Sequence, residues 1–126
     1  MLVTGVDIVE LHRIARVVER YGDRFLRRIY TQGEVDFCRG RIPQLAGRFA
    51  AKEAVMKALG TGIRGVGWRE VEVVRKRGQA PQVQLHGRAQ LKAEALGLQE
   101  LSLTTSHSKD YAVAFVVGVR DEVSNR

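Results

Sequence analysis

The sequence is poor in several residue types that mark particular classes of protein. It has one cysteine, Cys38, in 126 residues, which excludes an internal disulfide framework and fits a reducing compartment. The longest apolar stretch, Tyr111–Val119, is far shorter than the roughly 20 residues that span a bilayer. An acid, Asp7, stands where the apolar part of a signal peptide would lie. We therefore expect a cytoplasmic protein that does not enter the membrane.

Aromatic residues and linker residues are also scarce. The aromatic content is 6%, and the aromatics do not alternate with basic residues, which argues against a stacking platform for single-stranded nucleic acid. The two prolines, Pro43 and Pro81, do not form a linker, and the length suits one compact core. We therefore predict a single domain over residues 1–126.

Basic residues outnumber acidic ones in the sequence. Lys and Arg total 21 against 14 Asp and Glu, a formal net charge of +7, and 16 of the 21 basic residues are Arg. The planar fork of donors in Arg suits phosphate and carboxylate groups. The charge indicates either a polyanionic partner or simply a solvated, arginine-rich surface, and composition alone does not choose between them.

Hydrophobic periodicity and turn residues predict an α+β fold with a mostly antiparallel sheet packed against a long helix. Thr31 and Glu34 form a capping-box pattern that starts a short helix, and Gly60 is a natural stop for the longest helix. We predict strands at 2–9, 71–74, 83–85, 101–105 and 111–119, and helices from residue 11, at 31–39, 44–59 and 87–96. Residues 60–67 form a glycine-rich loop, and the apolar strand 111–119 is expected to be buried on both faces.

The first chemically suggestive residue is Asp7, which lies in an apolar strand two residues after Gly5. A carboxylate there is costly to bury unless a cation or hydrogen-bond donors meet it. It is either a ligand of a hard metal such as Mg²⁺ or a residue that ends the strand and caps the next helix.

The second candidate is the pair Glu53 and Lys57 on the predicted long helix. The two are four residues apart and share a face, the spacing of the commonest surface ion pair. Small alanines around them indicate close packing, so both side chains should be partly desolvated. Glu53 could then complete a metal site with Asp7, and Lys57 could meet an anionic oxygen.

Two further stretches carry polar or basic groups. Residues 104–109, Thr-Thr-Ser-His-Ser-Lys, lie between two predicted strands and either hold phosphate or form a hydrogen-bonded hairpin loop. The helix that begins at Leu11 has Arg13, Arg16 and Arg20 on one face, and we expect Arg24, Arg27 and Arg28 to extend it.

These motifs together resemble the holo-[acyl-carrier-protein] synthases, the small bacterial class of 4′-phosphopantetheinyl transferases. The matching segments cover the chain from end to end in the family's order: Gly5–Val9, Gly47–Ala54 with Lys57, Gly60–Gly62, and Ser106–Ala112. The combination of Phe-x-x-Lys-Glu-Ala-x-x-Lys with an upstream Gly-x-Asp is highly specific. Residues 69–97 contain nothing diagnostic.

The resemblance implies transfer of the 4′-phosphopantetheine arm from coenzyme A to a serine of acyl carrier protein, in the service of fatty acid biosynthesis. It also implies that adenosine 3′,5′-bisphosphate is released and that the enzyme is a homotrimer with active sites between subunits. In such enzymes the residues matching Asp7 and Glu53 hold Mg²⁺, and the one matching Lys57 contacts phosphate. The residues matching Arg48, Gly60, His107 and Ser108 lie near the nucleotide.

The partner supplies the serine nucleophile, so catalysis would rest on Asp7, Glu53 and Lys57. The base that takes the serine proton is Glu53 or a metal-bound water, and Lys57 assists the departing phosphate. The basic face formed by Arg13, Arg16, Arg20, Arg24 and Arg28 suits an acidic carrier helix.

Two other classes stay open on the sequence alone. An RNA-binding module would explain the charge and the Gly62–Gly65 pattern but would leave Asp7 and Glu53 unused. A metal-dependent nuclease would use both carboxylates, although no further acidic cluster stands out. We favour the transferase and expect no nucleic-acid partner.

Overall fold

The computed structural model describes residues 1–121, so that the last five residues of the predicted domain, 122–126, lie outside the described part of the chain. Its main sheet has three antiparallel strands in the order β1-β5-β4, and a separate hairpin pairs β2 with β3. The strands are β1 (Leu2–Glu10), β2 (Val71–Val74), β3 (Gln82–Leu85), β4 (Leu98–His107) and β5 (Tyr111–Arg120). The helices are α1 (Leu11–Tyr21), α2 (Asp23–Ile29), α3 (Gln32–Cys38), α4 (Ile42–Leu59), α5 (Gly62–Gly65) and α6 (Gly87–Leu96), with a 3-10 turn η1 (Trp68–Glu70).

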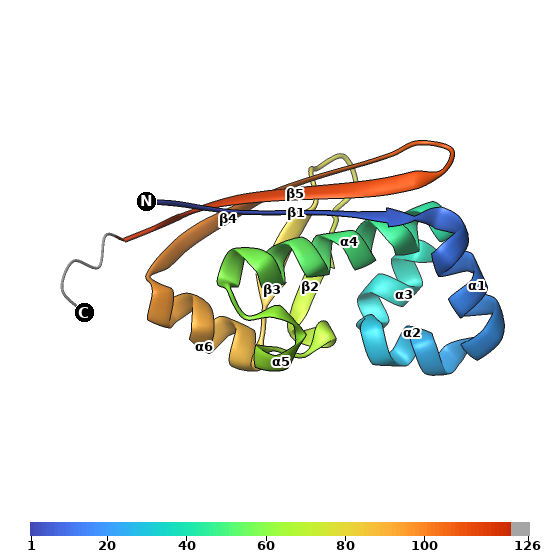
Figure 1. The fold of residues 1–126 in the computed structure, drawn as a ribbon, viewed down its shortest axis with the longest axis horizontal. Helices are drawn as coiled ribbons and strands as arrows, with labels where there is room; N and C mark the ends of the chain where they lie inside the picture. The colour runs from blue at the N-terminus through green and yellow to red at the C-terminus, as the bar shows by residue number, and fades with distance from the viewer. Residues whose placement is uncertain (122–126) are drawn as a thin grey trace.

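The helices lie on one face of the three-stranded sheet, and α4 runs beneath β1 and β5 (Figure 1). The hydrophobic core lies between this sheet and α4, as the predicted α+β arrangement requires. In the part of the chain that the structure describes, no helix is long and apolar enough to cross a membrane.

Small residues bring α4 against the sheet. Ala50, Ala51 and Ala54 are fully buried, and a methyl group added at Gly5 would lie only 1.9 Å from the carbonyl oxygen of Ala54. The helix begins two residues before the predicted start because Pro43 is tolerated in its first turn. It ends as predicted at Gly60, which adopts the left-handed conformation with φ of 75°.

The basic segment after Leu11 is two helices rather than one continuous face. α1 ends at Tyr21 because Gly22 has φ of 54°, and α2 begins directly after it. Helix α2 was not predicted as a separate element. Arg24, Arg27 and Arg28 therefore belong to a different helix from Arg13, Arg16 and Arg20.

Three other expectations need correction. The apolar strand β5 is buried on one face only, since Ala112, Ala114 and Val116 are buried whereas Phe115 is 41% exposed. The polar residues 104–107 belong to strand β4, so that the hairpin turn is confined to residues 108–110. The glycine-rich segment after Gly60 contains the short helix α5 rather than an irregular loop.

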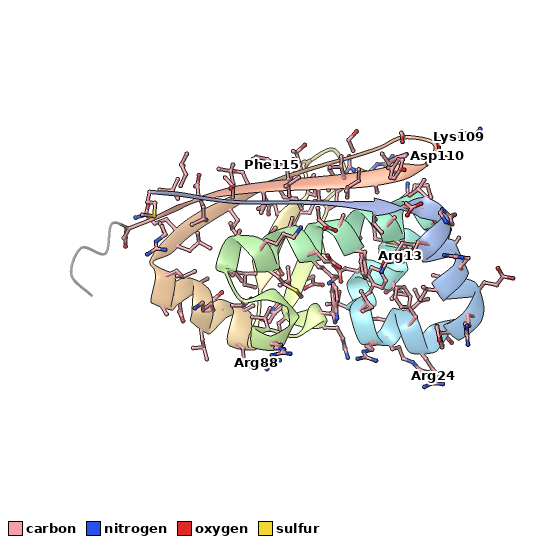
Figure 2. All side chains as sticks on the ribbon, viewed as in Figure 1. Arg13, Arg24, Arg88, Lys109, Asp110 and Phe115 are labelled. Carbon is pink, nitrogen blue, oxygen red and sulfur yellow. The ribbon has the colours of Figure 1, made fainter. Side chains whose placement is uncertain are left out.

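The outer face of the sheet, which is turned away from the helices, is apolar and uncovered by any described residue. Side chains alternate across a strand, so residues 6 and 8 of β1 point outward while Asp7 points toward α4. Val6 is 53% exposed and Ile8 is 61% exposed. Phe115 lies on the same face, where Figure 2 shows it above the sheet. We call this surface the outer face: Leu2, Val6, Ile8, Tyr111, Phe115 and Val119.

Candidate active site

The structure brings Asp7 of β1 and Glu53 of α4 together, although they are far apart in the sequence. The two side chains interact at close range, since the pKa of Glu53 is raised first by burial and then by the negative charge of Asp7. The positive charges of Lys57 and Arg13 oppose that rise without cancelling it. The close packing of β1 on α4 at Gly5 places the two carboxylates side by side.

Lys57, one helical turn after Glu53, reaches across to the same strand. Its ammonium nitrogen lies 2.9 Å from the Val6 carbonyl oxygen and 3.2 Å from Asp7 Oδ1. The Lys57 side chain is 56% exposed, whereas that of Asp7 is 13% exposed. We call Asp7 and Glu53 the acidic pair and Lys57 its lysine. The site that these three side chains form is accessible to solvent on the β1 flank of α4.

The acidic pair has the donor chemistry of a magnesium site. Mg²⁺ is bound in proteins by one or two carboxylates and completes its octahedral shell with water and phosphate oxygens. Two adjacent carboxylates whose mutual repulsion raises the pKa of Glu53 are a favourable place for a divalent cation. Residues 1–121 contain no group of three or more His, Cys, Asp and Glu side chains able to hold a metal.

A second cluster lies on the opposite flank of α4, next to β4. Arg48 and His107, two of the predicted nucleotide residues, line one cavity of about 290 Å³. Arg41 and Arg75, which the sequence analysis did not single out, line it too. The remaining lining residues are Phe37, Pro43, Gln44, Gly47, Thr105 and Ser106. Three guanidinium groups and an imidazole around one cavity indicate a site for an anion.

Arg48 is the most unusual member of this cavity. It is 8% exposed, and its guanidinium carbon lies 4.1 Å from the centre of the Phe37 ring. Its Nε and Nη2 have no hydrogen-bond partner among residues 1–121. Burial lowers the pKa of Arg48, and the charges of Arg75 and Arg41 lower it further, against opposing effects of Cys38 and Glu34. A buried cation with unsatisfied donors is costly unless an anion completes it.

The structure places the other two predicted nucleotide residues outside that cavity. Ser108 closes the β4–β5 turn, where its hydroxyl oxygen accepts from the backbone N–H groups of Asp110 and Tyr111 at 3.3 Å and 3.2 Å. Gly60 ends α4, and a methyl group added there would meet no atom within 4 Å. Neither residue lines the cavity that holds Arg48.

The basic residues of α1 and α2 surround two grooves. Arg13, Arg16 and Arg20 line a groove of about 680 Å³ along α1. Arg24 and Arg28 line a neighbouring groove of about 480 Å³ with an apolar floor, to which Val17, Phe25, Ile29 and Trp68 contribute. Arg27 lines neither groove, so the structure separates it from the rest of the predicted face.

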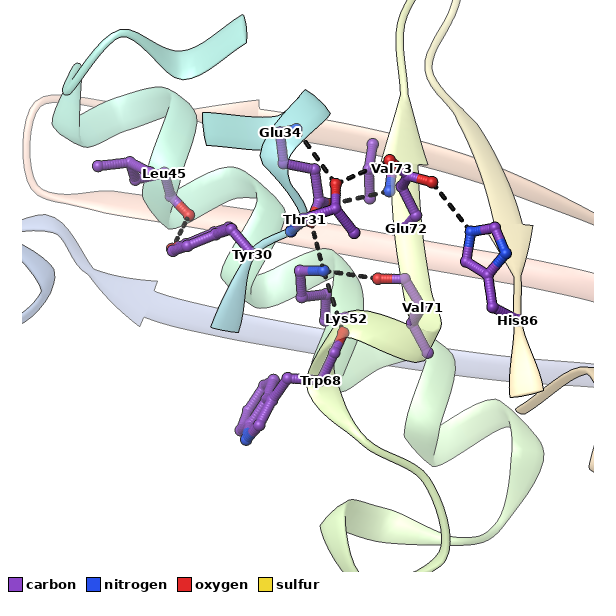
Figure 3. Close-up of polar contacts among 10 residues, drawn as sticks. All are labelled: Tyr30, Thr31, Glu34, Leu45, Lys52, Trp68, Val71, Glu72, Val73 and His86. Carbon is purple, nitrogen blue, oxygen red and sulfur yellow. Dashed lines mark hydrogen bonds and ion pairs between the residues drawn. The ribbon is translucent and has the colours of Figure 1, made fainter. Parts of the chain in front are cut away.

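A buried polar network connects α4 with α3, η1 and β2 (Figure 3). The ammonium of Lys52 lies 2.6 Å from Glu34 Oε1 and donates to the carbonyl oxygens of Trp68 at 3.1 Å and Val71 at 2.6 Å. Both charged side chains are fully buried. The predicted capping box is confirmed, since Thr31 Oγ1 accepts from the backbone N–H of Glu34 and the Glu34 carboxylate accepts from that of Thr31.

The sequence analysis treated Lys52 only as part of a motif and missed this role. The Glu34 carboxylate also accepts from the backbone N–H of Val73 at 2.8 Å. Lys52 and Glu34 therefore join α4, the start of α3, η1 and β2. The sequence did contain a signal for this buried ion pair: a lysine among the small apolar residues of a helix, together with an acid in a capping box.

Comparison with known proteins agrees with this arrangement. The family model of the 4′-phosphopantetheinyl transferase superfamily matches residues 4–116. The holo-[acyl-carrier-protein] synthase of Herpetosiphon aurantiacus is 48% identical, over 94% of this chain and 99% of the relative. That of Koribacter versatilis is 49% identical, over 93% of this chain and 97% of the relative.

The fold has the same relatives. The structure of Helicobacter pylori holo-[acyl-carrier-protein] synthase in complex with coenzyme A superposes with a TM-score of 0.84 at 32% identity, covering 92% of this chain and 99% of the other. A synthase–coenzyme A complex described as from Chronobacterium ammoniagenes gives 0.86 at 30% identity, covering 97% and 99%. The predicted α+β fold and transferase class are thereby confirmed. The chain belongs to the 4′-phosphopantetheinyl transferase superfamily and, within it, to the holo-[acyl-carrier-protein] synthases.

Proposed function

We propose that this protein carries out its family's reaction, transfer of phosphopantetheine from coenzyme A to a carrier serine, with the acidic pair and its lysine as the catalytic groups. The observation that carries the proposal is the meeting of Asp7, Glu53 and Lys57 at one solvent-open site. They come from two separate motifs, and the fold brings them together through the close contact of β1 with α4.

Asp7 and Glu53 would hold a magnesium ion in this site. When bound, the ion would neutralise charge that develops on the pyrophosphate oxygens. The chain's own contribution is to fix two carboxylates next to each other and to hold the ammonium of Lys57 near them through the Val6 carbonyl oxygen, 2.9 Å away. The third N–H of that ammonium is left for a phosphate oxygen, where it would stabilise the departing bisphosphate.

The serine hydroxyl of the carrier must lose its proton as it attacks phosphorus. Burial and the neighbouring Asp7 raise the pKa of Glu53, which makes it a better proton acceptor than an ordinary surface carboxylate. We therefore keep Glu53 as the candidate base, with water bound at the same site as the alternative.

The cavity on the opposite flank of α4 would hold the nucleotide end of coenzyme A. Arg48 offers two buried, unpartnered N–H donors there, with Arg41, Arg75 and His107 around them. A phosphate group would satisfy these donors and neutralise the cluster. Ser108 and Gly60 remain predicted contacts of the nucleotide, although they lie outside the cavity of this chain.

The two halves of the site favour a homotrimer with active sites between subunits. The acidic pair lies on the β1 flank of α4 and the Arg48 cavity on the β4 flank, so α4 stands between them. One coenzyme A could use both halves where two copies of the chain meet. The outer face supplies the apolar surface for that contact, because Val6, Ile8 and Phe115 lie together on it and are exposed.

The basic grooves of α1 and α2 would receive the acyl carrier protein. Arg13 contributes to the electrostatics of Glu53, so the groove along α1 adjoins the catalytic groups. A polyanionic carrier helix would be steered to this surface, and its association would weaken with salt. Within this proposal the enzyme serves fatty acid biosynthesis in the cytoplasm.

The experiment that tests the proposal is mass spectrometry of apo acyl carrier protein incubated with coenzyme A, Mg²⁺ and the enzyme. The carrier should gain the mass of phosphopantetheine, and Asp7→Asn or Glu53→Gln should abolish the gain. Asp36→Asn, which removes an exposed carboxylate on α3, is the matched control and should leave the rate unchanged. A full mass gain with Asp7→Asn would refute the assignment of the acidic pair.

Carrier docking has its own test. Charge reversal at Arg13 and Arg20 should raise the KM for the carrier at least tenfold and leave the KM for coenzyme A nearly unchanged. The same reversal at Arg88, which lies on α6 away from both grooves (Figure 2), is the control. Equal changes in the two KM values would contradict the docking assignment.

A further inference from the structure

The ammonium of Lys57 is bonded entirely to strand β1. It donates to the backbone carbonyl of Val6 at 2.9 Å and to Asp7 Oδ1 at 3.2 Å. An ammonium has three N–H donors, and with the side chain 56% exposed the third can point to solvent. The lysine is therefore anchored at one point by a neutral acceptor and at another by a charged one.

This arrangement balances the acidic pair within the chain itself. Asp7 is paired with the Lys57 ammonium at 3.2 Å, and its negative charge also acts on the neighbouring Glu53. Arg13 adds a weaker positive influence on Glu53. A divalent cation that binds both carboxylates must compete with the ammonium for Asp7 Oδ1 and then tolerate a positive charge next to it.

We propose that Lys57 is a built-in counter-cation that lowers the affinity of the acidic pair for divalent metal in the free enzyme. This inference rests on the proposed function, in which Asp7 and Glu53 hold the metal. A phosphate-bearing ligand gives the ammonium another anionic acceptor, and the bond to the Val6 carbonyl keeps the ammonium close while it turns away from Asp7.

The consequence is that metal and substrate bind cooperatively. Drawing the ammonium from Asp7 toward a phosphate frees a ligand position and reduces repulsion of the metal. By linkage, the metal then strengthens binding of the phosphate ligand by the same factor. Lys57 thereby favours metal that arrives with coenzyme A over metal that binds the empty site.

The test is a titration of the coenzyme A-free protein with Mn²⁺ at pH 8, followed by the electron paramagnetic resonance signal of free Mn²⁺. Removing one positive charge from the pair, in Lys57→Met, should tighten Mn²⁺ binding about tenfold. Arg13→Met should tighten it less, because Arg13 influences Glu53 less than Lys57 does. Lys92→Met removes the same net charge from an exposed position on α6, a different element from β1 and α4, and should change nothing.

The outcomes separate this inference from the proposed function. If Asp7→Asn leaves Mn²⁺ affinity unchanged, the metal site itself is wrong. If Asp7→Asn weakens binding while both Lys57→Met and Lys57→Gln fail to tighten it, the metal site stands and the counter-cation role is refuted. Equal tightening in Lys57→Met and Lys92→Met would refute it as well, since net charge alone would then explain the effect. Circular dichroism of each variant checks that it is folded.

Discussion

Gly5 sets the distance between the two halves of the acidic pair, and replacing it by alanine tests that dependence. The added methyl carbon would lie 1.9 Å from the Ala54 carbonyl oxygen and 3.1 Å from the Ala58 backbone nitrogen. Ordinary contact begins at 3.4 Å, so β1 must move from α4 by about 1.5 Å. The obstacle is backbone, which has no rotamer with which to move aside.

The displacement acts directly on the catalytic groups. Asp7 lies two residues after Gly5, and Glu53 precedes Ala54, so the same shift separates the two carboxylates. Misplacement of about 1 Å at a catalytic site can cost roughly 100-fold in rate. Overpacking typically costs about 1–3 kcal/mol, which leaves a protein of ordinary stability folded. We expect kcat/KM for carrier modification to fall about 100-fold while urea unfolding still shows a native state.

Gly118→Ala is the matched control for this experiment. Its added methyl carbon would lie 2.7 Å from Leu101 Cδ2 and 2.8 Å from the Glu100 carbonyl oxygen, a milder clash that is directed at β4. Gly118 pairs with Val3 rather than with Asp7, so the acidic pair should stay in place. We expect a loss of stability with kcat/KM within about threefold of wild type. A Gly5→Ala enzyme with similarly preserved kcat/KM would refute the argument.

Three other variants test separate parts of the structure. Lys52→Met leaves the Glu34 carboxylate buried without its partner and should lower the free energy of unfolding by about 3–5 kcal/mol. In urea melts, the double variant Lys52→Met with Glu34→Gln should lose less stability than the two single variants lose together. Strictly additive losses would contradict the coupling. Because the pKa of Glu53 is raised in the folded protein, its contribution to stability is present below its ordinary pKa and is lost as pH rises through the raised value. Glu53→Gln should therefore be more stable than wild type at pH 8, and this difference in stability should vanish near pH 4. A stability difference that stays the same at both pH values would contradict the prediction. Arg75→Met should raise the KM for coenzyme A at least fivefold, whereas Arg77→Met, outside the cavity, should not; equal effects would exclude Arg75 from the nucleotide site.

Local signals in the sequence predicted most of the elements. The capping box at Thr31 and Glu34 uses two residues three apart, and Gly60 ends α4 through its own backbone conformation. Such features depend on neighbouring residues only, and sequence shows them directly. The meeting of Asp7 with Glu53 is a long-range contact. It could be anticipated only because the family resemblance joined the two motifs.

The remaining features depend on space rather than on neighbours in the chain. Gly22 breaks the basic segment into α1 and α2, but arginines recur on both sides of it, at Arg20 and Arg24, and hid the break. The cavity at Arg48 gathers Arg41 and Arg75 from the start of α4 and the β2–β3 turn, and no spacing rule relates those positions. The periodicity of β5 could not show that one of its two apolar faces is open.

Two positions, Phe115 and Arg48, have surroundings that the stability of a single chain does not explain, and both have a role in the proposed function. An isolated globular chain gains nothing from an exposed Phe115, or from a buried Arg48 whose Nε and Nη2 meet no partner in the described part of the chain. Each cost would be relieved by a group that the single chain does not contain: a second copy on the outer face and a phosphate in the Arg48 cavity. The acidic pair differs, because Lys57 already balances it within the chain. If the proposals hold, a metal ion at the acidic pair must compete with Lys57 for Asp7. A phosphate group in the Arg48 cavity instead meets donors that have no competing partner among the described residues. The metal should therefore bind the free enzyme more weakly than the phosphate group does.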